Sequence, residues 1–222
     1  MIIKYIGHAC FKIQDKETGF SIIFDPYKDG VVPGYASIKD TANMILCSHE
    51  HDDHSGVESV VKEKNTNNPY IVQVIKTYHD PERGTLRGEN KIHVIINKFT
   101  GEKIIHYGDL GEKLEDLLTE ENLTLLKNAD VVFVPVGNIY TYDAMQALAL
   151  MGATKPDIMI PMHFRCDELK FGYTNIDSLD IFLDEALAQN KKVYNAETNP
   201  YDFSENKFSN CILVMRPENA KQ

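Results

Sequence analysis

Nine consecutive residues in the first quarter of the chain, 48–56, concentrate side chains that can bind metal ions. They read S-H-E-H-D-D-H-S-G and carry His49, His51, Asp53 and His54. Imidazole nitrogens and carboxylate oxygens are the ligands that a borderline divalent ion such as zinc accepts. In an extended segment side chains alternate, so His49 and His51 point to the same side. The pattern H-x-H-x-D-H therefore predicts two ligands for one metal ion and two for a neighbouring one, with a solvated polar loop as the alternative.

Three further residues of the same chemical types occur later in the chain. His79, Asp109 and His163 each stand where an apolar run stops and a turn containing glycine or proline begins. A single histidine at a strand end is more often a polar residue with a local hydrogen-bond partner. Ligand types that recur at the same end of several strands converge on one rim of a sheet sandwich. The set therefore predicts a metal site to which the whole fold contributes.

The composition limits the classes of protein to consider. The 222 residues are 43% hydrophobic and 25% charged, which is ordinary for one soluble domain over residues 1–222. A formal net charge of −10 argues against nucleic-acid binding, which depends on Lys and Arg at phosphates. Neither an apolar span of membrane length nor a charged-then-apolar leader is found. Cysteines scattered at 10, 47, 166 and 211 favour a reducing cytoplasm over a disulfide framework.

Strands dominate the hydrophobic pattern of the first half. Apolar runs predict strands over 1–6, 10–14, 20–24, 42–47 and 70–76, and a hairpin that joins 91–97 to 103–107. The run 42–47 is continuously apolar, as expected of a strand that helices cover on both faces. A short helix is predicted over 57–64, directly after the metal-binding segment.

Helices and strands alternate in the second half. Apolar positions three and four apart predict helices over 113–118, 121–127, 141–151 and 176–189. Strands are predicted over 130–134, 156–160, 192–194 and 211–215. Both halves can supply a sheet with helices outside. The predicted fold class is therefore α/β (α+β), a four-layer αββα sandwich.

The segment His49-x-His51-x-Asp53-His54 resembles the signature of the metallo-β-lactamase superfamily. The surrounding chain is similar to the small stand-alone bacterial hydrolase branch, which includes relatives of the ascorbate-6-phosphate lactonases. Asn138 stands where this branch is expected to have a second glycine. The resemblance implies the same αββα sandwich. It covers most of the chain up to residue 190 and is carried by 7–11, 135–137, 140–141 and 161–163.

The resemblance also implies a set of metal ligands. In the superfamily one ion is held by the first two signature histidines and a later one, which match His49, His51 and His79. The other ion is held by the signature aspartate, its neighbouring histidine and a last histidine, which match Asp53, His54 and His163. An aspartate in a Gly-Asp turn bridges both ions and matches Asp109.

Hydrolysis is the chemistry expected of this ligand set. Two divalent ions about 3.5–4 Å apart would lower the pKa of a shared water to about 7, so that a metal-bridging hydroxide attacks a small ester, lactone or phosphoester. Asp53 or Asp109 would orient the hydroxide, which makes them the candidate catalytic residues. Zn²⁺ is the expected metal, with Mn²⁺ or Fe as alternatives, because sites of mixed nitrogen and oxygen ligands also follow metal availability. The expected partner is a small-molecule substrate.

Two other functions stay open. A protein of the same fold with a sensing or binding role would carry the same ligands. Iron-dependent thioester or sulfur chemistry also shares the histidine signature. Oxygen-reducing diiron relatives resemble this chain but carry Glu where it has His51, so this histidine favours hydrolysis.

Five residues outside the ligand set are candidates for supporting roles. The family typically has an aspartate at the position of Asp25 that hydrogen-bonds a metal-site histidine, and a turn-starting Asp-Pro is the alternative. His8 is expected near the site without binding metal directly. Arg87, Tyr140 and Arg165 are candidates to contact the substrate, although a surface or packing role suits each of them equally.

Overall fold

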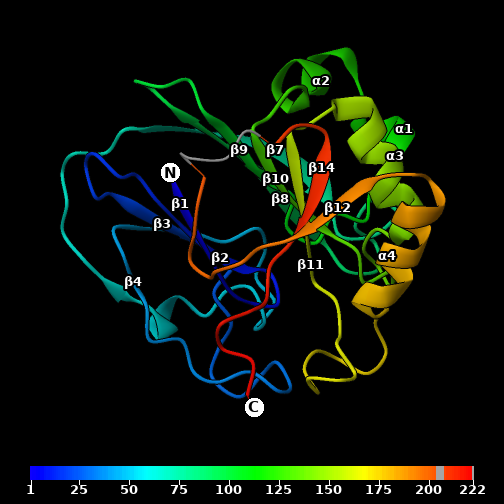
Figure 1. The fold of residues 1–222 in the computed structure, drawn as a ribbon, viewed down its shortest axis with the longest axis horizontal. Helices are drawn as coiled ribbons and strands as arrows, with labels where there is room; N and C mark the ends of the chain where they lie inside the picture. The colour runs from blue at the N-terminus through cyan, green and yellow to red at the C-terminus, as the bar shows by residue number, and fades with distance from the viewer. Residues whose placement is uncertain (204–207, 222) are drawn as a thin grey trace.

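Two β-sheets face each other in the computed structural model, which describes residues 1–203 and 208–221 (Figure 1). The first sheet has five strands in the order β13-β1-β2-β3-β5. β1, β2 and β3 are antiparallel neighbours, and β5 pairs with β3 in parallel. The strands are β1 (Ile2–Gly7), β2 (Cys10–Gln14), β3 (Ser21–Phe24), β5 (Met44–Leu46) and β13 (Tyr201–Asp202).

The second sheet has seven strands in the order β12-β14-β11-β10-β9-β8-β7. β7, β8 and β9 form an antiparallel meander, and the pairs from β9 to β12 are parallel. Its strands are β7 (Tyr70–Tyr78), β8 (Glu89–Asn97), β9 (Lys103–His106), β10 (Val131–Pro135), β11 (Ile158–Met162), β12 (Lys192–Asn195) and β14 (Cys211–Val214). A separate two-stranded sheet pairs β4 (Thr41–Ala42) with β6 (Val61–Lys62).

Four α-helices lie on the outer side of the seven-stranded sheet (Figure 1). They are α1 (Leu114–Leu117), α2 (Glu120–Leu126), α3 (Ala144–Thr154) and α4 (Leu179–Ala188). The expected sandwich is confirmed, with one difference: within the described residues, strands and loops lie on the side of the five-stranded sheet where the fourth layer was expected to be helical (Figure 1). No helix of the described part is long and apolar enough to span a membrane.

The core between the sheets is built around aromatic rings. The rings of Phe11 and Phe133, from opposite sheets, stack with centroids 4.1 Å apart, and Phe24 stacks on His106 at 5.0 Å. All four side chains are fully buried. Burying a phenylalanine stabilises the folded state by about 1.5–3 kcal/mol, so these contacts hold the two sheets face to face.

The helix predicted over 57–64 is wrong. The chain forms a 3-10 turn at Val57–Ser59 and then the strand β6, which pairs with β4. β-branched Val60 and Val61 suit the extended conformation that pairing with β4 offers. The segment 48–56 is therefore followed by a short turn, and no α-helix begins beside the ligand-rich residues.

The strand predicted over 42–47 is also different from the structure. It is divided between β4 and β5, and β5 is the edge strand of its sheet with only partly buried side chains. Its continuous apolar character therefore does not reflect cover on both faces. The helix predicted to start at 141 starts at Ala144, because the side chain of Asp143 caps it by accepting the N–H of Gln146. The helix predicted to start at 176 starts at Leu179, with Ser178 at its N-cap position. β13 was not predicted, and it pairs with β1 at the edge of the sheet.

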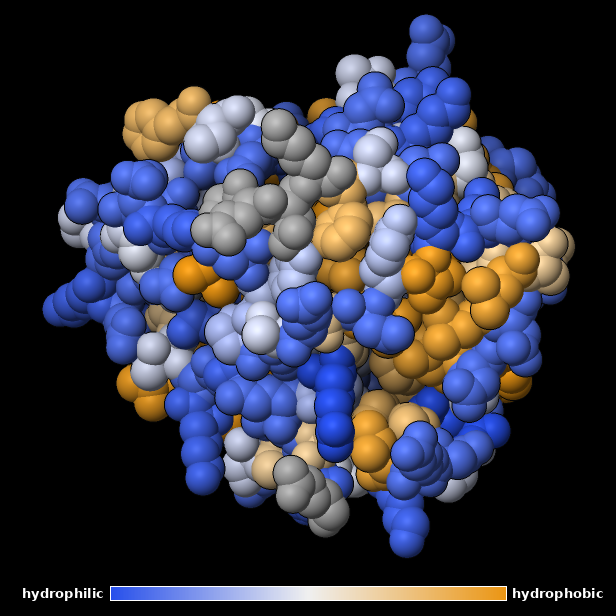
Figure 2. All heavy atoms as spheres, viewed as in Figure 1, coloured by the Kyte–Doolittle hydropathy of each residue, from blue (hydrophilic) through white to orange (hydrophobic). Residues whose placement is uncertain are grey.

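Most of the surface seen in this orientation is hydrophilic (Figure 2). Apolar residues gather over the side of β12 and α4, where Ile181, Leu187 and Tyr194 are exposed (Figure 2).

The strands that matter for function all end at the same edge of the sandwich. β1, β3 and β5 run parallel to one another through their pairings, and so do β7, β9, β10 and β11. Ligands of α/β proteins bind outside the carboxyl ends of such strands. The segments that follow these strand ends carry the polar residues predicted above.

Candidate metal centre

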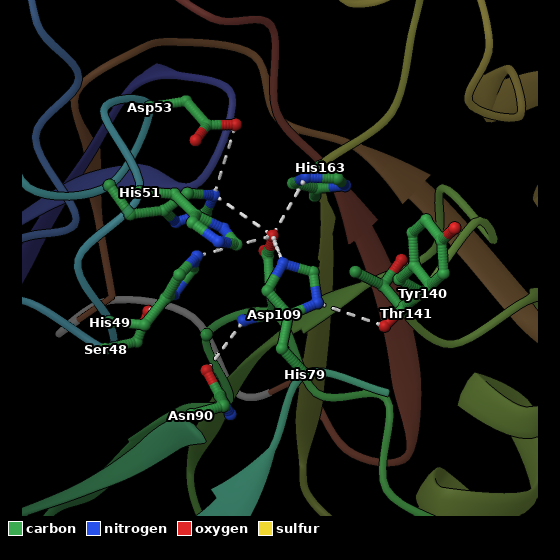
Figure 3. A network of polar contacts seen from close by, with 12 residues as sticks. Ser48, His49, His51, Asp53, His79, Asn90, Asp109, Tyr140, Thr141 and His163 are labelled. Atoms are coloured by element: carbon green, nitrogen blue, oxygen red, sulfur yellow. Dashed lines mark hydrogen bonds and ion pairs between the residues drawn. The ribbon is translucent and has the colours of Figure 1, made fainter. Parts of the chain in front are cut away.

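Every predicted ligand lies in a loop that follows the carboxyl end of a strand (Figure 3). The segment 48–54 follows β5 from the five-stranded sheet, whereas His79, Asp109 and His163 follow β7, β9 and β11 of the other sheet. The site therefore lies across the two sheets. Residues more than a hundred positions apart in the sequence meet there.

The carboxylate of Asp109 is the centre of the cluster (Figure 3). Its Oδ2 lies 3.0 Å from His79 Nε2, 3.2 Å from His163 Nε2, 3.2 Å from His54 Nε2 and 3.9 Å from His49 Nε2. Its Oδ1 is buried and has no hydrogen-bond partner among the described residues. One carboxylate thus faces four imidazoles from three different loops.

One group of potential ligands consists of three histidines. A nitrogen of each of His49, His51 and His79 lies within 4.8 Å of the others. The rings of His49 and His51 are 4.6 Å apart, although the chain bends at 48–51 instead of running extended as predicted. His49 Nδ1 is hydrogen-bonded to Ser48 Oγ at 2.8 Å, which leaves its buried Nε2 without a hydrogen-bond partner among the described residues.

A second group contains Asp53, His54 and His163 together with His8. His8 follows β1 and is fully buried, with its Nε2 3.3 Å from Asp53 Oδ2 and its ring 4.3 Å from the ring of His163. The sequence placed His8 near the site, and the structure brings it into direct contact with two of the predicted ligands.

Asp25 orients His54 from behind. Its buried Oδ2 lies 2.9 Å from His54 Nδ1 and also accepts the hydroxyl of Ser48 at 2.6 Å, while Oδ1 accepts the backbone N–H of Ser48 at 2.7 Å. With Nδ1–H donated to Asp25, Nε2 is the nitrogen of His54 that faces Asp109, and it would carry the lone pair once a metal ion displaces its proton. The contact between Asp25 and a site histidine is the one the family resemblance implied.

Sequence reasoning missed Asn90, which fixes the backbone of Asp109. Asn90 is buried in β8; its Oδ1 accepts the N–H of Asp109 at 3.0 Å, and its Nδ2 donates to the carbonyl of Tyr107 at 2.9 Å. Gly108, between Tyr107 and Asp109, has a φ of +57°, and a Cβ added there would lie 2.4 Å from atoms of Ser48 and Asn90. An asparagine inside a strand gives no signal in the sequence, because its partner is distant in the chain.

Electrostatic coupling within the cluster is strong. Burial alone would raise the pKa of Asp109, but the neighbouring His163, His54 and His79 hold it well below its usual range. Burial would lower the pKa of His54, yet Asp109 and Asp53 raise it well above its usual value. In the ion-free cluster a proton on an imidazole thus balances Asp109. A metal ion must displace that proton, since ligating imidazoles are neutral.

Other histidines of the cluster are held neutral. Burial lowers the pKa of His8 to about 4. Burial and the nearby charge of His54 lower the pKa of His49 to about 3. A neutral imidazole presents a free lone pair, which is the form that binds metal.

The residues fit divalent metal ions. Nitrogens of several histidines and oxygens of two aspartates converge. Among the described residues five buried atoms of the cluster have no hydrogen-bond partner: His49 Nε2, His54 Nε2, Asp109 Oδ1, and Nδ1 of His8 and His163. Buried polar atoms without partners cost free energy, so each requires an explanation. Metal coordination would satisfy His49 Nε2, His54 Nε2 and Asp109 Oδ1, and the nitrogen and oxygen donors suit Zn²⁺, Mn²⁺ or Fe.

A cavity of about 290 Å³ opens over the cluster. Arg87 lines it, and Tyr140 lies beside it: the guanidinium carbon of Arg87 lies 4.7 Å from the centre of the Tyr140 ring. The Tyr140 carbonyl accepts a hydrogen bond from His79 Nδ1 at 3.1 Å (Figure 3). The remaining lining residues include four that sequence reasoning missed, Ile139, Tyr173, Asn175 and Ile176.

Arg165 makes its contacts within the chain. Its Nε donates to the carbonyl of Ile176 at 2.8 Å, and a terminal nitrogen is paired with Asp167. It is not among the residues that line the cavity. These contacts hold the loop that carries Tyr173 and Ile176, so they give no support to the prediction that Arg165 touches the substrate.

Comparisons with known proteins agree with this fold and site. Residues 2–163 match the family model of the beta-lactamase superfamily domain. A UPF0173 metal-dependent hydrolase from Carboxydothermus hydrogenoformans is 28% identical over 74% of this chain and 84% of the relative. One of the same name from Natranaerobius thermophilus is 24% identical over 74% of this chain and 83% of the relative. The expected relation to ascorbate-6-phosphate lactonases stays a prediction.

A solved structure has the same architecture. The crystal structure of a metallo-β-lactamase superfamily protein from Thermotoga maritima superposes with a TM-score of 0.68 at 24% sequence identity, over 96% of this chain and 97% of the other. The family match extends over most of the chain and includes all seven predicted ligands, the last of them at its final residue, His163. The chain therefore belongs to the metallo-β-lactamase superfamily.

Proposed function

We propose that this chain is a hydrolase that works with two divalent metal ions. His49, His51 and His79 would hold one ion, and Asp53, His54 and His163 the other, with Asp109 between them. The observation that carries the proposal is the position of Asp109, whose Oδ2 lies within 3.2 Å of nitrogens from three loops. The names of the matched relatives, metal-dependent hydrolases, support the same class of activity.

The two ions would supply an activated water and a Lewis acid for the bond to be cleaved. Asp109 and Asp53 would orient that water through their carboxylates while they remain ligands. Asp25 holds the tautomer of His54, and His8 holds Asp53. In our proposal neither Asp25 nor His8 touches the substrate; both position residues that would bind metal.

Hydrolysis of a small ester, lactone or phosphoester suits the cavity. Its volume of about 290 Å³ matches a small molecule, and Arg87 and Tyr140 are the proposed substrate contacts. The lining residues include no Ser, Cys, Thr or Lys, and the aspartates and histidines among them are proposed metal ligands, so water is the proposed nucleophile.

The proposal takes residues 1–222 as one domain, because both sheets contribute ligands. We place the reaction in the cytoplasm, since Cys10, Cys47, Cys166 and Cys211 are all free thiols. A small molecule is the proposed partner, and the net charge of −10 makes nucleic acid an unsuitable one.

Metal analysis tests the site directly. Protein reconstituted separately with Zn²⁺, Mn²⁺ or Fe²⁺ should retain close to two equivalents per chain after desalting, and one of these forms should hydrolyse a lactone, ester or phosphoester. Asp109→Asn should lose at least one equivalent and most of the turnover. Asp52→Asn is the matched control, because this exposed carboxylate lies in the same segment and pairs with Lys28. Full metal content in the Asp109 variant would refute the bridging role, and absence of metal from the native chain would refute the site.

A further inference from the structure

We propose that Arg87, seated on the ring of Tyr140, is an anion-binding subsite at the mouth of the metal cavity. The substrate would then carry a carboxylate or phosphate group apart from the bond that is hydrolysed. This inference rests on the proposed function, because it concerns the substrate of the same site.

Among the described residues Arg87 is a cation without a carboxylate partner. It lines the cavity beside His51 and His79, and no ion pair of its guanidinium is found among the described residues. The neighbouring Arg83 in the same loop does pair, with Asp116 at 3.6 Å. The guanidinium of Arg87 instead stacks on the Tyr140 ring, which leaves its N–H edge available. Guanidinium groups bind carboxylates and phosphates through two parallel hydrogen bonds along that edge.

Asp80 fixes the loop that presents Arg87. This carboxylate is fully buried and accepts four backbone N–H groups, from Glu82 and Gly84 through Oδ1 and from Leu86 and Arg87 through Oδ2, at 2.7 to 3.1 Å. Charge-assisted hydrogen bonds of this kind are strong and directional. Asp80 follows His79 directly, so it ties the backbone of Arg87 to the metal site.

The Tyr140 side of the subsite is equally constrained. Asn138, Ile139 and Tyr140 have φ values of +59°, +26° and +64°. Left-handed backbone is costly for residues with side chains, and runs of it occur where surrounding structure imposes them, often at ligand sites. Here the carbonyl of Tyr140 is held by His79 Nδ1 and lies against Gly111, where an added Cβ would meet it at 2.1 Å. The ring beneath Arg87 is therefore held in place by the site itself.

The charge balance of the cavity favours an anion. The lining residues include two carboxylates, Asp53 and Asp109, and two divalent ions would more than neutralise them. Arg87 adds a further positive charge. The rest of the protein is acidic, with a net charge of −10, so a small anion suits this cavity better than a polyanion does. The apolar residues Ile139 and Ile176 would then contact the carbon chain that joins the anionic group to the reacting bond.

A matched set of esters tests the subsite. We would compare the phenyl ester of hexanoate, the phenyl half-ester of adipate and the phenyl ester of 6-phosphonooxyhexanoate, which differ only in the terminal group. The native protein should show a kcat/KM at least tenfold higher for one anionic ester than for the neutral one. Whichever anionic ester has the higher kcat/KM shows whether the subsite prefers a carboxylate or a phosphate. Arg87→Met should reduce the anionic-to-neutral ratio to near one, and Arg87→Lys should restore part of it.

Arg83→Met is the matched control, because Arg83 lies in the same loop outside the cavity. It should keep the native ratio and metal content. A second readout does not depend on turnover: phenylglyoxal modification, followed by mass spectrometry, should slow at Arg87 and not at Arg83 when adipate or 6-phosphonooxyhexanoate is added. Hexanoate should protect less. A native ratio near one, or a raised ratio that Arg87→Met retains, would overturn the subsite while metal content and hydrolysis leave the proposed function standing.

The Asp80→Asn variant tests whether Asp80 positions Arg87 for the anion or only stabilises the loop. The variant should bind two equivalents of metal and show a raised KM for the anionic ester, with a lowered anionic-to-neutral ratio. Combined with Arg87→Met it should lower that ratio no further, since both changes remove the same contact. Equal losses on the neutral and anionic esters would show that Asp80 only stabilises the loop.

Discussion

Single carboxylates decide much of the chemistry at the residue scale. Asp109 faces the imidazoles of His54, His79 and His163, and Asp25 and His8 act one contact further out. Such outer contacts set the tautomer of an imidazole and the direction of a carboxylate. The ligand types alone therefore do not fix metal affinity, and variants of the outer residues are informative.

Asp25→Asn should weaken metal binding without removing a ligand. The amide would offer N–H groups where Ser48 and His54 now donate to two carboxylate oxygens, so His54 would lose the hydrogen bond that fixes its tautomer. We expect an affinity about 10–100-fold lower, measured by competition with a chelator. Asp52→Asn should bind as the native protein does, and native affinity in the Asp25 variant would contradict the role.

The ion-free protein should lose stability as the pH falls from 7 to 5, in part through His8. Burial lowers the pKa of His8 to about 4, whereas an unfolded histidine titrates near 6.5. Between these values unfolding takes up a proton, so stability is present at pH 7 and is lost as the pH falls through this window. The contribution of His8 between pH 7 and 5 is about 2 kcal/mol.

Urea unfolding at both pH values tests this contribution. The ion-free His8→Gln variant should lose about 2 kcal/mol less between pH 7 and 5 than the native chain does. Tyr173→Phe is the control, because its ring touches His8 and the removed hydroxyl does not titrate in this range. Identical pH dependence in native and His8→Gln protein would show that His8 is not held neutral.

Strand ends dominate at the element scale. Three site residues directly follow the last residue of a strand and have positive φ values: His8 (+57°), Asp25 (+42°) and His163 (+54°). The left-handed turn aims each side chain across the rim instead of along the strand. Such conformations cost of order 1 kcal/mol or more for residues other than glycine, so the site is assembled against local backbone preference by the packing of both sheets.

Gly108 provides a test at this scale. Gly108→Ala should destabilise the protein through its left-handed backbone, by about 1–2 kcal/mol, and through the 2.4 Å approach of Cβ to Ser48 and Asn90. It should also lower metal content, because Asn90 holds Asp109. Gly101→Ala is a matched control with φ +77° and no atom within 4 Å of the added Cβ. Equal unfolding free energies for the two variants would contradict the packing role of Gly108.

At the scale of the whole molecule, the metal centre joins two sheets. The ligands after β5 belong to the five-stranded sheet, and those after β7, β9 and β11 to the seven-stranded one. An ion bound by both would be released on unfolding, and a ligand that binds only the folded state stabilises it by mass action. The stability of this fold should therefore depend on metal.

Thermal unfolding with and without metal tests this linkage. At a free metal concentration one hundred times Kd, one site adds about 2.7 kcal/mol, so Tm should rise with added Zn²⁺ and fall with a chelator. In Asp109→Asn the rise should shrink, while Asp52→Asn should keep it. A Tm independent of metal in the native chain would contradict binding across the two sheets.

The sequence by itself determined the types and local spacing of the ligands. His49, His51, Asp53 and His54 are close in the chain, so they lie near one another whatever the rest of the fold does. The extended conformation predicted for His49 and His51 is wrong, because the chain bends at 48–51. Apolar runs ending at His79, Asp109 and His163 also follow from local periodicity, and these strand ends are confirmed by β7, β9 and β11.

Only the tertiary structure decided which distant side chains meet. Pairing of 61–62 with 41–42 replaced a predicted helix by a strand, and packing across the two sheets brought Asn90 and Tyr173 to the site. Arg87 and Arg165 looked alike in the sequence, yet one stacks on Tyr140 at the cavity and the other pairs with Asp167. These outcomes depend on contacts between residues far apart in the chain, which local propensity and spacing do not specify.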